Sequence, residues 1–282
     1  MADLTVLSYL QARALLQARK EGASTATISL DLGLTSDQVV LQSDRVILAD
    51  GQWLSWGWIE KISTNETACF RVEGSQPTKI QQFSNYLNRF YSLLPTVQAP
   101  TLLVSGIPMH RIKGTDPLQD THLKIRSIAP LAGRVLDTCT GLGYTAVAAA
   151  RTAEQVVTVE LDPAVLEIAR QNPWSMPLFA DSCIQQIVGD VFEVIQDFEA
   201  ETFSRVVHDP PMFSLAGDLY SGQFYRHLFR VLRCRGRLFH YIGDLDSRSG
   251  RNVVRGVARR LEEAGFVRII RRPAAFGVVA FK

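Results

Sequence analysis

The pattern of hydrophobic and polar positions changes character near residue 105. Before it, an amphipathic stretch at 4–20 predicts a helix, and short alternating segments between turn residues predict strands at 26–32, 39–41, 45–48, 53–59 and 67–72. A second helix is expected over 78–94, ending before Pro95, and a further strand over 102–104. We therefore predict that residues 1–105 form a small β-rich α+β domain, which selects the substrate.

From residue 106 to 282, predicted strands and helices alternate. The strands are expected at 134–137, 156–160, 186–189, 204–208, 237–241, 267–271 and 276–281, with helices at 117–128, 144–151, 163–171, 191–195, 223–232 and 250–264. This alternation indicates an α/β, Rossmann-like domain of seven strands covered by helices on both faces. The last two strands lie too close in sequence for a parallel crossover, so they form an antiparallel terminal hairpin.

Composition narrows the class of protein. With 282 residues, 46% hydrophobic and 21% charged, the chain is typical of a globular protein. Its apolar runs are far shorter than the ~20 residues that span a bilayer, and its start has no basic region before an apolar run. We expect a cytoplasmic protein with no membrane partner. Its four cysteines are scattered and the histidines do not cluster with them, so no disulfide and no metal site is expected.

The charge is unevenly distributed along the chain. The net charge is +2, but residues 220–282 are strongly basic. Arginines recur there at helical spacing, in the rows Arg226, Arg230, Arg233 and Arg251, Arg255, Arg259. Such rows either bind the phosphates of a polyanion or form solvated helix faces. RNA is therefore a candidate partner.

Candidate ligand-binding residues follow the first three strands of the α/β domain. Ligands of open α/β sheets bind beyond the carboxyl ends of the strands. Glycines after the first strand let the backbone turn closely under a ligand, and an acid after each of the next two can accept hydrogen bonds from ribose hydroxyls and from the adenine amino group. The candidate cofactor-binding residues are Asp137, Thr138, Thr140, Gly141, Gly143, Tyr144, Thr145, Glu160, Leu161, Asp190, Val191 and Asp209.

The fourth strand runs into the segment Asp209-Pro210-Pro211. Two successive prolines fix the backbone and hold the preceding residue in extended geometry. The segment is therefore a rigid loop that directs the Asp209 carboxylate toward the ligand, and its three residues are the candidate catalytic residues. The candidate substrate contacts are His110 and Arg111, just before the α/β core, and Phe213 after the prolines.

Residues 106–282 resemble class I S-adenosylmethionine-dependent methyltransferases. Asp137 to Thr145 is similar to the first motif of that superfamily and Asp209-Pro210-Pro211 to the fourth, which is shared by enzymes that methylate amino or amide nitrogen. The segments around His208 and His240 are similar to predicted methyltransferases of archaea and cyanobacteria. The resemblance implies S-adenosylmethionine as the cofactor, no metal, and an amino nitrogen of a nucleobase in RNA or of a small molecule as the acceptor.

Two residues depart from the family pattern. Cys139 replaces the usual first glycine of the first motif, which is tolerable only with an ordinary negative φ. Met212 occupies the place of the usual aromatic residue, with Phe213 one place later.

Three other functions fit parts of the pattern. The glycines at 141 and 143 with Glu160 also satisfy a dinucleotide fingerprint. Aminopropyltransferases share the fold and a β-rich N-terminal domain, and have a segment similar to 219–226. A non-catalytic nucleic-acid-binding protein would use the arginines. We favour methyl transfer over a dinucleotide enzyme, because the Asp-Pro-Pro loop and the terminal hairpin are not required by the dinucleotide fold. We favour it over aminopropyl transfer, because the loop offers a polyamine mainly Asp209 and Asp218.

Overall fold

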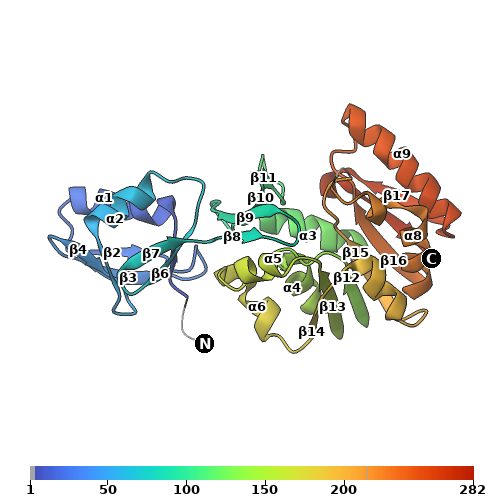
Figure 1. The fold of residues 1–282 in the computed structure, drawn as a ribbon, viewed down its shortest axis with the longest axis horizontal. Coiled ribbons are helices and arrows are strands. Elements are labelled where there is room, and N and C mark those ends of the chain that lie inside the picture. The colour runs from blue at the N-terminus through green and yellow to red at the C-terminus, as the bar shows by residue number, and fades with distance from the viewer. Residues whose placement is uncertain (1–3, 214) are drawn as a thin grey trace. The chain divides into compact units, whose positions relative to one another are not determined.

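The computed structural model describes residues 4–213 and 215–282, without the side chains of residues 248 and 249. The chain forms two compact units (Figure 1). The first consists of residues up to 118 together with 164–176, and the second of residues 119–163 and 177–282. In the described residues, no helix is both long enough and apolar enough to cross a lipid bilayer.

The strands of the first unit form three small sheets within the part of the chain that is described. All pair antiparallel within their sheets, in the orders β1-β6-β7, β2-β3-β4-β5 and β11-β10-β9-β8. The strands are β1 (Val6–Leu7), β2 (Thr25–Ile28), β3 (Asp37–Leu41), β4 (Arg45–Ile47), β5 (Trp53–Ser55), β6 (Phe70–Glu73), β7 (Gln76–Lys79), β8 (Gln81–Ser84), β9 (Arg89–Leu94), β10 (Thr101–Val104) and β11 (Ile107–Pro108).

Two helices pack on this β structure. Helix α1 (Tyr9–Lys20) begins with a capping box, in which the Ser8 side chain accepts a hydrogen bond from a helix amide and Gln11 accepts one from the Ser8 amide. Helix α2 (Trp56–Ser63) replaces the second half of the strand predicted over 53–59. Trp56 and Ile59 are three residues apart and both buried, a helical spacing that the alternating aromatic residues obscured.

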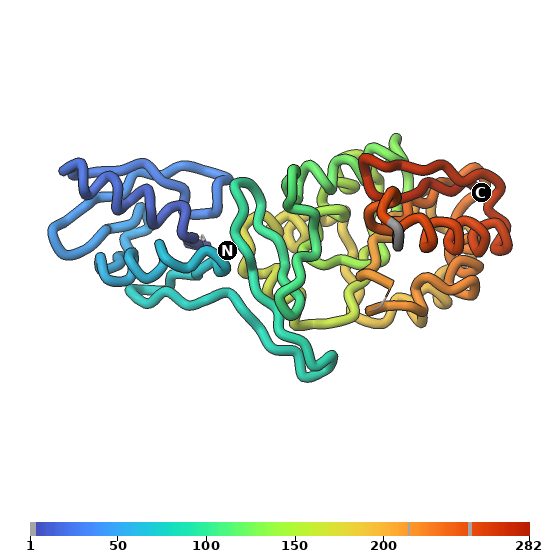
Figure 2. The backbone as a smooth tube through the Cα atoms, turned by 90° about the horizontal axis from the view of Figure 1, so that it is seen from above, coloured from blue at the N-terminus to red at the C-terminus, as the bar shows by residue number. Residues whose placement is uncertain are grey.

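The helix predicted over 78–94 is wrong, because this segment contains part of β7 and all of β8 and β9. Figure 2 shows the chain doubling back here, in teal to green. Phe83 and Phe90 lie opposite each other across the β8–β9 hairpin, and Asn88 has the positive φ of 51° that its turn requires. Cross-strand pairing outweighs the helical periodicity of the segment.

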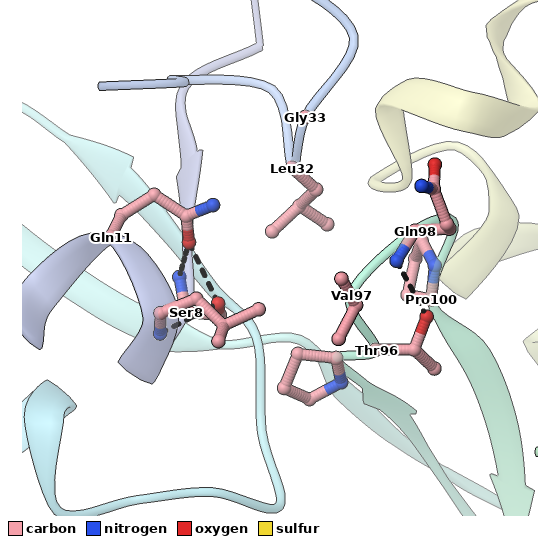
Figure 3. Close-up of a pocket in the computed structure, with 10 residues that line it drawn as sticks. Ser8, Gln11, Leu32, Gly33, Thr96, Val97, Gln98 and Pro100 are labelled. Atoms are coloured by element: carbon pink, nitrogen blue, oxygen red, sulfur yellow. Dashed lines mark hydrogen bonds between the residues drawn. The ribbon is translucent and has the colours of Figure 1, made fainter. Parts of the chain in front are cut away.

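A small pocket of about 40 Å³ lies in the first unit (Figure 3). Leu32 and Val97 line it, and the Ser8 and Gln11 side chains hydrogen-bond to each other at 2.7 Å on its wall.

The second unit is built on a seven-stranded sheet in the order β14-β13-β12-β15-β16-β18-β17. The first five strands in this order pair parallel, and β18 pairs antiparallel with both of its neighbours, as predicted for the terminal hairpin. The strands are β12 (Arg134–Asp137), β13 (Gln155–Glu160), β14 (Ile184–Val188), β15 (Phe203–His208), β16 (Leu232–Tyr241), β17 (Arg268–Arg272) and β18 (Gly277–Phe281).

Helices cover both faces of this sheet. Alternate strand residues belong to different apolar clusters: Leu136 and Val206 pack with α7, α8 and α9, while Val135 and Val207 pack with α3, α4 and α6. Helices α8 and α9 lie side by side (Figures 1 and 2). These helices are α3 (Pro117–Ile128), α4 (Tyr144–Ala150), α6 (Met176–Ala180), α7 (Val191–Val194), α8 (Gly222–Val231) and α9 (Arg248–Glu263). Helix α5 (Pro163–Ala169) lies, apart from its first residue, in the first unit.

Candidate functional site

The candidate site lies at the carboxyl ends of β12, β13 and β15. Chain order reverses between the neighbouring strands β12 and β15, because β13 and β14 lie on one side of β12 and β15 and β16 on the other. Ligands of open α/β sheets bind at such a switch point. The residues predicted from the first, second and fourth strands of the domain all follow these strands.

The turn after β12 needs glycine at two positions. Gly141 and Gly143 have φ values of 54° and 79°, in the region that L-residues with a side chain seldom adopt. A Cβ on Gly143 would also lie 2.6 Å from a methyl carbon of Leu178. Within the described residues, Cys139 is not one of the positive-φ positions, so it satisfies the condition under which it can replace a glycine.

Asp137 is fully buried at the end of β12. Its Oδ2 accepts hydrogen bonds from the hydroxyls of Thr145 at 3.1 Å and Thr158 at 2.9 Å, and Thr158 also contacts Thr140 at 2.6 Å. Burial raises the pKa of Asp137 to about 7; the threonine bonds oppose this rise, and the charge of Asp209 adds to it. In the described part of the chain, the buried Oδ1 has no hydrogen-bond partner, so Asp137 offers an acceptor to a ligand.

Glu160 ties the end of β13 to the glycine turn. Its Oε2 accepts a hydrogen bond from the Gly141 amide at 2.8 Å, and its Oε1 accepts one from the Asp162 amide at 3.1 Å. Burial raises the pKa of Glu160 to about 7, although these amides lower it. Since each carboxylate oxygen has two lone pairs, acceptor capacity remains for ribose hydroxyls.

The residues after β14 show a structural role. Asp190 is the N-cap of α7, and its Oδ1 accepts a hydrogen bond from the Phe192 amide at 2.8 Å. Val191 is buried and Leu161, after β13, is half-buried. Contact of Asp190, Val191 and Leu161 with adenine stays a prediction.

Asp209 is part of an ionic cluster that the sequence analysis missed. Its Oδ2 lies 2.6 Å from Nζ of Lys124, and the same Nζ lies 2.9 Å from Oδ2 of Asp120. Lys124 is 2% exposed, and burial alone would lower its pKa; the two carboxylates outweigh burial and raise it. Asp120 and Lys124 are four residues apart on α3, a spacing that sequence alone cannot distinguish from a solvated ion pair.

The His208 side chain, at the end of β15, hydrogen-bonds to Thr138 in the turn after β12 and to Leu219 in the segment before α8. Its Nε2 lies 3.0 Å from the Leu219 carbonyl, which can only accept, so Nε2 carries the proton and Nδ1 accepts from the Thr138 hydroxyl at 2.7 Å. Burial lowers the pKa of His208 to about 3 and keeps the ring neutral. The Tyr220 hydroxyl donates to the Pro211 carbonyl at 3.1 Å, which anchors the proline loop.

The remaining candidates have different surroundings. Tyr144 is buried at the start of α4. Phe213 is 53% exposed, and its ring meets that of Tyr220 edge to face at 5.4 Å. His110 and Arg111 belong to the first unit, where His110 Nδ1 lies 2.9 Å from the Thr101 hydroxyl. Their contact with a substrate stays a prediction.

Metal-binding groups do not assemble in the described chain. Among residues 4–213 and 215–282, no three His, Cys, Asp or Glu side chains are grouped so that they could hold a metal ion.

Comparisons with known sequences give one extensive match. No family model matches the chain. The uncharacterized protein MJ1233 of Methanocaldococcus jannaschii is 41% identical over 261 residues, which cover 90% of this chain and 88% of that protein. The polyamine aminopropyltransferase of Sulfolobus acidocaldarius is 31% identical over 93 residues, 31% of this chain and 30% of that protein.

Solved structures share the fold. A spermidine synthase in complex with the transition state analogue AdoDATO has a TM-score of 0.59 at 18% identity, with 71% of each chain covered. At 18% identity, this match shows a shared fold and nothing about function. The seven-stranded sheet thus has the class I S-adenosylmethionine-dependent methyltransferase-like fold that spermidine synthases also have. By its long match, the chain belongs to the family of MJ1233.

Proposed function

We propose that this protein is a transferase that moves an alkyl group from a sulfonium nucleoside of the S-adenosylmethionine class to an amine. The observation that carries the proposal is the grouping of Asp137, Glu160 and Asp209 at the switch point of the sheet. Asp137 and Glu160 have raised pKa values and are poised to regain charge when a cation or hydroxyl donors bind. A sulfonium donor brings an alkyl carbon that is already activated for attack, so the protein contributes position and charge.

Aminopropyl transfer is the better supported form of this reaction. The partial sequence match is to an aminopropyltransferase, and the fold match is to a spermidine synthase. The charges agree: Lys124 is shared between Asp120 and Asp209, so the cluster keeps a negative charge. A decarboxylated donor suits such a site, because it lacks the carboxylate that Asp209 would repel.

Methyl transfer is the second candidate, and the proline loop favours it. The hydrogen bond from the Tyr220 hydroxyl to the Pro211 carbonyl holds the loop that contains Asp209. Asp209 and the Pro210 carbonyl would accept the hydrogens of an amino group and turn its lone pair toward the donor. The exposed Phe213 ring would stack on a flat acceptor.

The proposed residue roles follow the predicted set. The turn from Asp137 to Thr145 and the end of β13 at Glu160-Leu161 hold the nucleoside, with Glu160 on the ribose and Asp190 and Val191 near adenine. Asp209 and the prolines at 210 and 211 face the reacting groups. His110 and Arg111 contact the acceptor, and the N-terminal residues 1–105 select it.

The deciding experiment is calorimetric titration of the purified protein with decarboxylated S-adenosylmethionine, S-adenosylmethionine and NAD. We expect both sulfonium nucleosides to bind and NAD not to bind. Incubation with putrescine and each donor then separates the two forms of the reaction, since only aminopropyl transfer releases methylthioadenosine. Binding of NAD alone would contradict the proposal.

A further inference from the structure

The carboxylates beside Lys124 differ in their access to solvent. Asp120 is fully buried, Lys124 is 2% exposed, and the Asp209 side chain is 19% exposed. Asp209 is therefore the member of the cluster that a ligand can reach. Asp120 is the fully buried member, and both carboxylates contact the same ammonium group.

The contacts among Asp120, Lys124 and Asp209 determine the net charge of this three-residue cluster. One ammonium between two carboxylates leaves a single negative charge, whereas Lys124 and Asp209 alone would be neutral. A buried lysine beside two carboxylates stays protonated, because the ionic contacts of 2.6 and 2.9 Å outweigh its desolvation. The Tyr241 ring, 4.6 Å from Nζ, adds a cation–π contact.

Among the described residues, the charge of Asp209 acts on three neighbouring groups whose pKa values are shifted. Asp209 raises the pKa values of Asp137, Cys139 and Tyr220, which are all acids. The adjacent His208 is neutral, since its pKa is lowered to about 3. Lys124 is the cation that the structure places in direct contact with Asp209, at 2.6 Å.

We infer that Lys124 and Asp120 are positioning residues that hold Asp209 as a fixed, ionised carboxylate, so that Asp209 orients a cationic nitrogen of the substrates and does not take up a proton during transfer. This inference rests on the proposed function and specifies how its central carboxylate works. An Asp209 oxygen 2.6 Å from an ammonium group is a poor base, because protonation would remove its charge from that ion pair.

The proton balance of the reaction agrees with this role. The acceptor ammonium loses its proton to water before attack; then the carbon–nitrogen bond forms while the carbon–sulfur bond breaks and its electron pair remains on sulfur. The product amine keeps the positive charge that the sulfonium loses. No protein base is consumed, and the alkaline dependence of the rate follows the pKa of the acceptor amine, near 10 for an alkylamine.

The first test measures protonation without turnover. In carboxyl-labelled protein, the Asp209 carbon-13 resonance, assigned by its loss in Asp209→Asn, is expected to stay constant from pH 5 to 8. In Lys124→Met the two carboxylates lack their cation and share a proton, so a titration appears within this range. The double variant Asp120→Asn/Lys124→Met relieves the repulsion and moves the titration back toward lower pH. An Asp209 resonance that titrates between pH 5 and 8 in the wild type would overturn the inference.

The second test uses binding and kinetics. Asp120→Asn removes the net charge while keeping the Lys124–Asp209 pair, so binding of decarboxylated S-adenosylmethionine weakens about tenfold or more, and binding of neutral methylthioadenosine stays within about twofold. In Lys124→Met, kcat falls about tenfold per pH unit below the new titration. The exposed Lys79→Met is the matched control and keeps the wild-type profile.

These outcomes separate the two proposals. If Lys124→Met does not fold, Asp120→Asn still decides, since equal loss of the charged and neutral ligands would show a merely structural cluster. If no sulfonium nucleoside binds the wild type, the proposed function fails, yet the resonance measurement still reports whether Asp209 is held ionised. If donors bind and react but Lys124→Met keeps the wild-type pH profile, the inference alone fails.

Discussion

In the described residues, Asp209 forms an ion pair with Lys124, whereas the hydrogen bonds described for Asp137 and Glu160 come from neutral groups. Asp137 and Glu160 both have pKa values raised to about 7, chiefly by burial. Their hydrogen bonds come from hydroxyls and backbone amides, which offset only part of the desolvation. The charged forms of both residues are therefore costly, and a ligand that donates hydrogen bonds or carries positive charge would stabilise them.

Glu160→Ala should weaken binding of the sulfonium nucleoside by about ten- to more than a hundredfold. The change removes charged hydrogen bonds worth roughly 1.5–3 kcal/mol. It also removes the acceptor of the Gly141 amide, which loosens the glycine turn. Glu160→Gln is the matched control, because it keeps one acceptor oxygen and should lose less affinity. Calorimetry that finds unchanged affinity in the alanine variant would remove Glu160 from the site.

Asp137→Asn should become more stable relative to the wild type as the pH rises from 5 to 8. The folded protein holds a proton on Asp137 up to about pH 7, whereas the unfolded chain releases it near pH 4. Stability from such a group is present at low pH and is lost as the pH rises through the folded pKa. Asparagine does not titrate, so the difference in unfolding free energy grows by roughly 1–3 kcal/mol.

Chemical denaturation at several pH values measures this difference. His208, whose pKa is lowered to about 3, makes both proteins less stable as the pH falls below about 6.5, and this contribution cancels in the comparison. A pH-independent difference between the two proteins would show that Asp137 is ionised in the folded state throughout.

At the scale of elements, the strand–turn–helix unit β12–α4 depends on one close contact. Gly143→Ala should destabilise the second unit by roughly 1–3 kcal/mol, because the residue has positive φ and a new Cβ would meet Leu178 at 2.6 Å. Gly133→Ala is the control: it has a similar φ of 74°, but its nearest neighbour lies at 3.5 Å. Equal destabilisation of the two variants in thermal unfolding would assign the whole cost to backbone conformation.

The strands and helices of the α/β part were predictable, because the spacing of hydrophobic residues within each segment is typical of its own secondary structure. The strand over 134–137 and the helix over 117–128 match β12 and α3. Segments whose conformation depends on distant partners were not predictable. The hairpin of β8 and β9 has a local periodicity typical of a helix, and only pairing such as Phe83 with Phe90 selects the strands.

The site shows the same division. The glycines and acidic residues at strand ends could be predicted as site residues from the sequence. Lys124 could not, because its position on a predicted helix is typical of a solvent-exposed lysine. Its partner Asp209 is 85 positions away, and only the folded sheet brings the two side chains to 2.6 Å. The pair Asp120–Lys124 has the ordinary i, i+4 spacing of a helix. It becomes part of the candidate site only because it is buried and Lys124 contacts the distant Asp209.

The structure also changes the interpretation of the predicted basic row at Arg226, Arg230 and Arg233. Arg230 donates hydrogen bonds to the carbonyls of Ile195 and Phe198, and Arg233 belongs to β16 and not to the helix. The row predicted at Arg226, Arg230 and Arg233 is therefore not a helix face open to phosphates. These arginines serve partly to satisfy carbonyl groups of the second unit.

At the scale of the whole molecule, the row on α9 is expected to be a solvated face. Arg251, Arg255 and Arg259 are exposed, while Val254 and Val257 on the other side are buried. Charge reversal of the three arginines to glutamate should leave transfer to a small amine within about twofold of the wild type. RNA titrations at two salt concentrations test the alternative. Binding that weakens steeply with salt and is lost on charge reversal would identify RNA as a partner.

The two units are not two successive stretches of chain, and this affects how the protein is made. Residues 164–176 belong to the first unit, although 119–163 of the second precede them. On a ribosome, the first unit thus waits for its last segment after residue 118 has been added, for roughly 3–12 s at common elongation rates of about 5–20 residues per second. During that interval the nascent first unit lacks residues 164–176.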